Sequence, residues 1–174
     1  TYWDSQASTA LQASYDKLLK PFAGLKIIVM NIEALAYERA SKFALRFVKT
    51  HKTLGAVDES TTIKNPKAKR TLAAIQVGEH CLYRRIMTGS PVTKNPLDLY
   101  SQSMFLGENI LGFSSYYSFR ARYAEMIVVT LGARSFKKIK EFRHLDELSR
   151  NIQPWSYRVL KEDCLDLPPK IYEV

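Results

Sequence analysis

Two adjacent carboxylates follow a short apolar segment near the middle of the chain. Residues 54–57 (LGAV) have the composition of a buried strand, and Asp58 and Glu59 come directly after them. In an open parallel sheet, ligands bind beyond the carboxyl ends of the strands, so a phosphate-bound Mg²⁺ could lie beside this pair. Asp58 could hold the hydrated metal, while Glu59 could orient or deprotonate an attacking water. Such pairs are also common in ordinary turns, and the local pattern leaves both interpretations open.

A second polar turn lies about thirty residues further along the chain. Thr88, Gly89 and Ser90 follow an apolar segment, and the two hydroxyls could form hydrogen bonds with the acidic pair. Glycine would let the backbone pass close to a neighbouring group. The alternative is a routine strand-to-loop turn that Pro91 ends.

Alternating strands and helices are predicted to position these turns. Apolar β-branched runs indicate strands, whereas apolar residues at helical spacing and Asn-Pro pairs indicate helices and their starts. The strands are expected at 26–30, 53–57 and 85–87, and the helices at 35–48, 65–77 and 95–106. Three consecutive strand–helix units predict an α/β fold with a parallel sheet and helices on its faces.

The pattern changes after residue 112. A helix is expected at 116–124, a β-hairpin from 126–130 and 134–142, a helix at 145–152 and a last strand at 157–160. We therefore divide the chain into a main part (1–112), a helix and β-hairpin insertion (113–156) and a closing segment (157–174).

The chain is basic, with a formal net charge of +9 and an isoelectric point near 9.5. This balance favours a polyanionic partner. Two clusters could contact phosphates: Lys64, Lys67, Lys69 and Arg70 in the first, and Arg134, Lys137, Lys138 and Lys140 in the second. Each could instead be a solvated face. The aromatic residues of segment 116–123 have helical spacing, which favours core packing over base stacking.

Other classes of site have little support. Cys81 and Cys164 are isolated, so neither a zinc site nor a disulfide framework is indicated. The three histidines are far apart in the sequence, and we assign none of them a catalytic role. No apolar run is long enough to span a membrane, and the start lacks the order of a signal peptide, so a cytoplasmic location is expected.

Taken in order, the motifs resemble motifs two and three of superfamily-two helicases, in the branch of the Swi/Snf-type DNA-dependent ATPases. The resemblance covers roughly residues 25–174 and rests on 57–60 (VDES), 63–65 (IKN), 68–71 (AKRT), 87–92 (MTGSPV), 97–102 (LDLYSQ), 105–106 (FL), 157–163 (YRVLKED) and 167–170 (LPPK). Many relatives have Ala-His where this chain has Ser60 and Thr61. In this respect the chain resembles phage and bacterial members of the family.

The resemblance implies a three-layer RecA-like fold of the P-loop NTPase type, of which residues 1–112 are the C-terminal part of the first lobe. It also implies ATP and Mg²⁺ as cofactors, with double-stranded DNA and a second RecA-like lobe as partners. Asp58 would bind the metal, Glu59 would be catalytic, and Thr88, Gly89 and Ser90 would be the coupling motif. Asn31 would contact the nucleic-acid backbone, although a helix N-cap explains it equally well.

The sequence departs from this family at one motif. A phosphate-binding loop needs Gly-x4-Gly-Lys and then Ser or Thr, and the chain contains none. Residues 107–112 have the glycine spacing, but Phe113 replaces the lysine. Since this loop and the second lobe are both missing, we expect the chain not to hydrolyse ATP alone. It starts at Thr1 and ends on a strand-like run, so we expect a fragment. The expected source is a prokaryotic or phage-infected cell. A non-enzymatic nucleic-acid-binding module and a metal nuclease are the alternatives.

Overall fold

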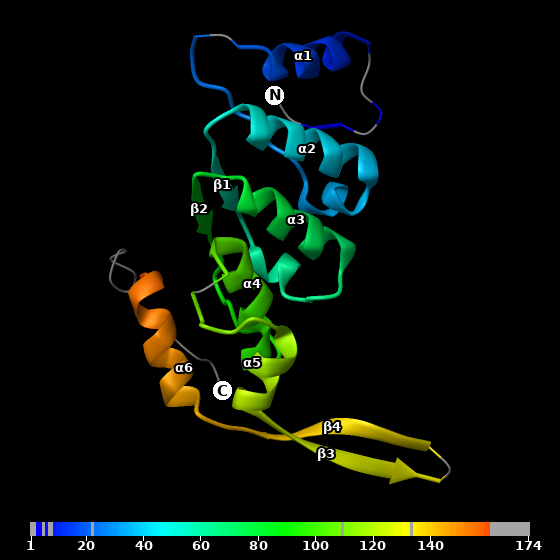
Figure 1. Ribbon diagram of the computed structural model, residues 1–174, viewed down its shortest axis with the longest axis vertical. Helices are drawn as coiled ribbons and strands as arrows, with labels where there is room; N and C mark the ends of the chain where they lie inside the picture. The colour runs from blue at the N-terminus through cyan, green and yellow to red at the C-terminus, as the bar shows by residue number, and fades with distance from the viewer. Residues whose placement is uncertain are drawn as a thin grey trace, which may run out of the picture.

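The computed structural model describes residues 3–4, 6, 9–21, 23–108, 110–132 and 134–160. Its helices and strands follow one another along a column from which one hairpin projects (Figure 1). They are α1 (Thr9–Leu19), α2 (Glu38–Thr50), β1 (Leu54–Val57), α3 (Lys69–Glu79), β2 (Tyr83–Ile86), α4 (Leu99–Leu106), α5 (Tyr116–Tyr123), β3 (Ala124–Leu131), β4 (Arg134–Phe142) and α6 (Leu145–Ile152). Short 3-10 helices lie at Ile32–Ala36, Ser60–Ile63, Pro96–Asp98 and Gln153–Trp155.

Strands β1 and β2 form a parallel pair joined through α3, which confirms two of the predicted strands. Their register runs from Leu54 opposite Tyr83 to Val57 opposite Ile86. Gly78 lets α4 approach α3 closely, because a Cβ there would lie 3.0 Å from the Phe105 ring and 3.1 Å from its carbonyl oxygen. The buried residues Leu35, Val57, Ile63, Ala74 and Phe105 form the core beneath this unit.

The predicted strands at 26–30 and 157–160 are wrong. Within the described part of the chain, the parallel sheet has two strands, and a larger RecA-like sheet is not confirmed. Residues 26–30 are not assigned as a strand, and only Val29 has a bridge assignment; its carbonyl accepts a hydrogen bond from the Trp3 amide at 2.7 Å. Residues 157–160 are exposed and are not assigned as a strand. Both segments have strand-like composition, but composition alone does not specify the neighbouring strand that a ladder requires.

The helices agree better with the sequence. Helix α2 buries Ala40, Phe43, Phe47 and Val48, as its spacing predicts. Helix α3 starts at Lys69 and not at Asn65, because the Asn65 side chain accepts a hydrogen bond from the Lys67 amide and holds a separate turn. Asn95 accepts from the Leu97 amide at 3.0 Å, and this cap confirms the predicted start of the next helical segment.

The β-hairpin of β3 and β4, which we call the arm (residues 124–142), confirms the predicted excursion. Helices α5 and α6 flank it in sequence, and α6 has the predicted bounds. Phe119 and Tyr123 are fully buried against Leu97, Tyr100 and Leu148. Core packing is therefore the role of these two aromatic residues.

The remaining predictions concern thiols and membranes. Cys81 is buried in a cluster with Phe47 and Val48, as expected of a core thiol, whereas Cys164 lies outside the described residues. Segments 161–163 and 167–170, which contribute to the family resemblance, also lie outside them. Among the described residues, no helix is long and apolar enough to cross a membrane.

Candidate active site

The turns that follow β1 and β2 lie side by side, and we call them the strand-end junction (residues 58–60 and 87–91). The Met87 amide donates to the Val57 carbonyl at 2.9 Å, and the Ser60 amide donates to the Met87 carbonyl at 3.0 Å. These bonds extend the parallel pairing beyond the last paired residues. The sequence prediction that the acidic pair and the Thr-Gly-Ser turn are neighbours is thus confirmed.

Asp58 and Glu59 are both exposed at this edge of the sheet. Glu59 has a left-handed backbone (φ 49°, ψ 58°), which is unfavourable for a residue other than glycine. Its amide donates to the Asp58 carboxylate at 3.0 Å, and its carbonyl accepts from the Thr62 hydroxyl at 2.9 Å. These bonds hold the strained turn and keep both carboxylates accessible to solvent.

The donor set at this turn fits a hard divalent cation. Carboxylate oxygens are the side-chain ligands that Mg²⁺ prefers, and the ion is usually held by one or two of them, with water and phosphate oxygens completing its shell. In the described part of the chain, no group of three or more His, Cys, Asp or Glu side chains is placed to hold a metal. Asp58 is the residue that would hold the cation, with Glu59 beside it.

Thr88 connects the second turn to the acidic pair. Its hydroxyl donates to the Glu59 carboxylate at 3.3 Å and accepts from the Ser90 amide at 3.2 Å. The Ser90 hydroxyl donates to the Val92 carbonyl at 3.0 Å, so it does not reach the acidic pair. A Cβ at Gly89 would meet no atom within 4 Å, and the reason we gave for this glycine, a close backbone approach, is wrong within the described structure.

A buried bridge beneath the junction was not predicted from the sequence. The Ser60 hydroxyl donates to the side-chain carbonyl of Gln102 at 2.6 Å. The Gln102 amide group donates to the carbonyls of Pro91 at 2.7 Å and Asp98 at 2.8 Å. Ser60 is 0% exposed and Gln102 1% exposed, so the bridge lies in the protein interior. One side chain of α4 thereby ties the turn after β1 to the loop after β2.

A second cluster fixes the loop that follows the junction. Asp98 accepts hydrogen bonds from the amides of Thr93 at 3.1 Å and Lys94 at 2.9 Å, and from the Thr93 hydroxyl at 3.0 Å. Burial alone would raise the pKa of the Asp98 carboxyl, but these hydrogen bonds and the nearby charge of Lys64 outweigh it and lower the pKa below its usual range. The Lys64 ammonium donates to the Thr93 hydroxyl. Lys64 thus stabilises this loop.

Of the other residues predicted to bind nucleic acid, two form hydrogen bonds within the protein and two are exposed lysines. Asn31 is exposed and caps the 3-10 helix at Ile32–Ala36 by accepting from the Glu33 amide at 3.1 Å, as the N-cap alternative requires. Arg70 donates to the Thr62 carbonyl at 2.8 Å and lies 3.9 Å from the Glu33 carboxylate. Lys67 and Lys69 are exposed, as they would have to be to contact phosphates.

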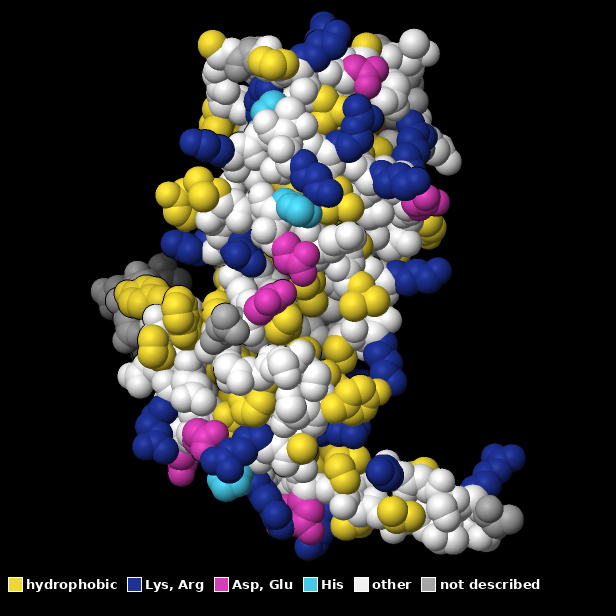
Figure 2. All heavy atoms as spheres, viewed as in Figure 1, with side chains coloured by type: hydrophobic (Ala, Val, Ile, Leu, Met, Phe, Trp, Pro, Cys, Tyr) yellow, Lys and Arg dark blue, Asp and Glu magenta, His cyan; other side chains and the backbone are white. Residues whose placement is uncertain are grey.

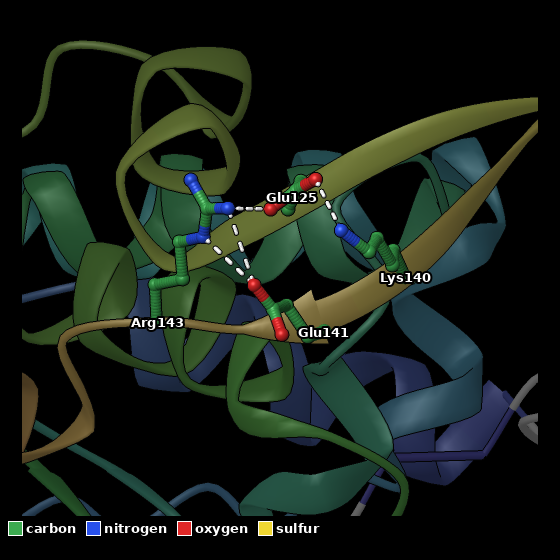
Figure 3. Close-up of polar contacts among 4 residues, drawn as sticks. All are labelled: Glu125, Lys140, Glu141 and Arg143. Atoms are coloured by element: carbon green, nitrogen blue, oxygen red, sulfur yellow. Dashed lines mark hydrogen bonds and ion pairs between the residues drawn. The ribbon is translucent and has the colours of Figure 1, made fainter.

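The basic residues of the arm also separate into two groups. Lys140 forms an ion pair with Glu125 at 3.0 Å near the base of the arm, where Arg143 contacts both Glu125 and Glu141 (Figure 3). Arg134, Lys137 and Lys138 are exposed further out, and no carboxylate of the described residues lies within ion-pair distance of them. Lys140 is therefore less available to a partner than the sequence suggested.

Comparison with known proteins gives the family. The SNF2-related domain matches residues 11–174. The chain is 39% identical over 120 residues to the human TATA-binding protein-associated factor 172, covering 67% of this chain. It is 34% identical over 146 residues to the TATA-binding protein-associated factor MOT1 of Saccharomyces cerevisiae (82% of this chain) and 34% identical over 119 residues to the protein CHROMATIN REMODELING 20 of Arabidopsis thaliana (65%).

These matches span 6% of the human relative and 8% of the other two. All three relatives are eukaryotic, so the expected phage or bacterial branch, and with it a prokaryotic or phage-infected cell, is not supported. The Swi/Snf-type resemblance is confirmed at the level of the family, since its domain matches nearly the whole chain. The chain belongs to the SNF2-related domain family.

Proposed function

We propose that this chain supplies the metal-binding and water-activating residues of the ATP-hydrolysis site in a motor that moves on double-stranded DNA. The observation that carries the proposal is the hydrogen bond between Thr88 and Glu59, which joins the ends of two parallel strands. Ligands of open α/β sheets bind at this edge. The phosphate-binding loop and a second RecA-like lobe would come from parts of the protein outside this sequence.

Each residue of the junction has a proposed role. Bound Mg²⁺ would neutralise charge on the phosphates, and the Asp58 carboxylate would hold it. Glu59 would orient a water molecule and accept its proton, since the carboxylate is exposed and held by the left-handed turn. The Thr88 hydroxyl would keep Glu59 directed toward that water. Through the same hydrogen bond, a movement of the Glu59 carboxylate would change the position of the loop after β2.

DNA is proposed as the polyanionic partner. The net charge of +9 and the exposed Lys67 and Lys69 support phosphate contacts that do not depend on base sequence. Lys64 and Arg70 are held by bonds within the protein, so they would contribute mainly by shaping this surface. Asn31 would contact the backbone of the nucleic acid next to them.

Substitution of Glu59 tests the proposal in the full-length natural protein. We expect Glu59→Gln to keep nucleotide binding and to lower ATP turnover by about 10² to 10⁴-fold, because the amide cannot accept the proton. Nucleotide affinity and single-turnover hydrolysis would be measured in parallel. Glu79→Gln is the control, since Glu79 is an exposed carboxylate at the end of α3.

The possible results separate the alternatives. Turnover retained in Glu59→Gln would assign Glu59 a structural role and refute the proposed site. Absence of turnover in the wild-type protein, with duplex binding intact, would instead favour a non-enzymatic nucleic-acid-binding module.

A further inference from the structure

The arm carries large apolar side chains into solvent. It projects from the column of helices, and both dark blue and yellow side chains are visible on its surface among white atoms (Figures 1 and 2). Leu131 is 71% exposed, Val128 64% and Phe136 50%. The tight connection at its end includes Gly132 with φ 59°, a left-handed backbone that glycine adopts readily. A single exposed apolar residue is unremarkable, but several of them on a protruding hairpin indicate a binding surface.

The register of the hairpin divides these side chains between two faces. Paired residues of an antiparallel ladder lie on the same face, and neighbours along a strand lie on opposite faces. Val129 is paired with Phe136, and Leu131 with Arg134. One face, which we call the wedge face, therefore consists of Ile127, Val129, Leu131, Arg134, Phe136 and Lys138. The opposite face carries the exposed Val128, paired with Lys137. Nearer the tip this face is polar, since the Thr130 and Ser135 hydroxyls lie 3.0 Å apart.

Charge is also unevenly distributed along the arm. Both of its carboxylates, Glu125 and Glu141, lie at the base and are engaged by Lys140 and Arg143 (Figure 3). Beyond this cluster, the described residues of the arm include three cations, Arg134, Lys137 and Lys138, and no acidic residue. The outer arm therefore presents apolar side chains flanked by positive charges.

We propose that the wedge face binds the minor groove of a nucleic-acid duplex, with Leu131 and Phe136 against the bases and the outer cations against the phosphates. The charge pattern fits a duplex groove, which has base edges at its floor and phosphates along both rims, and the exposed apolar side chains favour the minor groove. Two-stranded β-ribbons enter DNA grooves, and minor-groove proteins often insert apolar side chains between base steps. This inference rests on the proposed function for its duplex substrate.

Two variants of the full chain separate the two kinds of contact. In the cation variant, Arg134→Gln, Lys137→Gln and Lys138→Gln are combined; in the apolar variant, Leu131→Ser and Phe136→Ser. The cation variant should lower the slope of log affinity against log salt by roughly 0.9 for each lost phosphate contact. The apolar variant should keep that slope. It should lose the fluorescence increase of a 2-aminopurine placed in the duplex, because Leu131 and Phe136 are no longer present to unstack the bases of the duplex.

Lys140→Gln is the matched control, because Lys140 is a cation of the same strand that is already paired with Glu125. It should leave both measurements unchanged. Affinity would be measured by fluorescence anisotropy on a labelled duplex at several salt concentrations, with circular dichroism to verify folding. The single Lys138→Gln variant, with an expected slope change of roughly 0.9, replaces the triple variant if the latter does not fold.

The inference is overturned if the folded cation variant has the wild-type slope, or if the apolar variant keeps the full 2-aminopurine response. It is also overturned if the same residues are needed for binding anionic vesicles or a protein while duplex binding is unaffected. A wild-type chain that does not bind duplex at all would count against both this inference and the proposed DNA motor. Loss of the hydrolysis role of Glu59, with the arm results as expected, would refute the proposed active site alone.

Discussion

The strand-end junction and the arm use polar side chains in opposite ways. At the junction, Ser60 and Gln102 are buried and each finds partners within the protein. On the outer arm, Arg134, Lys137 and Lys138 are exposed and have no carboxylate nearby among the described residues. The junction therefore depends on side-chain hydrogen bonds within the protein for its shape. The outer arm is held by the backbone hydrogen bonds between β3 and β4, so its exposed side chains are available to a partner.

The largest expected effect on stability is at the buried bridge. Gln102→Leu should lower the free energy of unfolding by about 1–3 kcal/mol, because it leaves the Ser60 hydroxyl and the Pro91 carbonyl buried without their partner. The double variant with Ser60→Ala should lose less than the sum of the two single losses, since both partners of one bond are removed. Urea unfolding of all three variants gives the coupling.

Ser101→Ala is the control for this cycle. Ser101 adjoins Gln102 and is also fully buried, but its hydroxyl has no hydrogen-bond partner among the described residues. Its removal should leave stability nearly unchanged. Strictly additive losses in the Ser60 and Gln102 cycle would contradict the bridge.

A smaller effect is expected where α5 contacts α6. Arg122 donates to the Glu147 carboxylate with an Nε–Oε1 distance of 3.1 Å, and this bond lowers the pKa of the Glu147 carboxyl to about 2. A carboxyl whose folded pKa is below its usual value of 4.5 adds stability above that pH, and the contribution disappears as pH falls toward 2. Thermal melts between these values should show Glu147→Gln losing less stability on acidification than the wild type.

The smallest effect is expected for the outer arm in the absence of a partner. Leu131→Ser and Phe136→Ser should each change the free energy of unfolding by no more than about 0.5 kcal/mol, since both side chains are at least half exposed. Equilibrium unfolding measures this directly. A loss above about 2 kcal/mol would mean that these residues are packed against another part of the protein, and the contrast with the junction would no longer hold.

Local sequence patterns correctly predicted the helices and strands around the site. The wrong predictions concern strands, whose formation depends on contacts between segments far apart in the sequence. Strand β1 and the carboxylates after it are contiguous in sequence, so composition was enough to locate them. Residues 26–30 have an equally strong strand pattern, but strand formation depends on a neighbour that no local pattern specifies. The RecA-like sheet was for this reason predicted more fully than the described residues show.

Gln102 shows the same limit within the site. It is 42 residues from Ser60 in the sequence, and a glutamine on a helix ordinarily faces solvent. The α4 segment was recognised as part of the family pattern, yet nothing in its spacing indicated which side chain points inward at the junction. Lys64 and Arg70 were similarly grouped by charge, and only their bonds to Thr93 and Thr62 distinguish them from Lys67 and Lys69.

At Glu59, the residue that would best stabilise the left-handed turn differs from the residue that the proposed reaction needs. Glycine would relax this backbone, whereas glutamate keeps it under strain and supplies the carboxylate. Random mutagenesis selected for heat resistance alone would consequently favour loss of the acid at residue 59. The proposed catalytic role would account for a glutamate at a position where glycine would be the less strained residue.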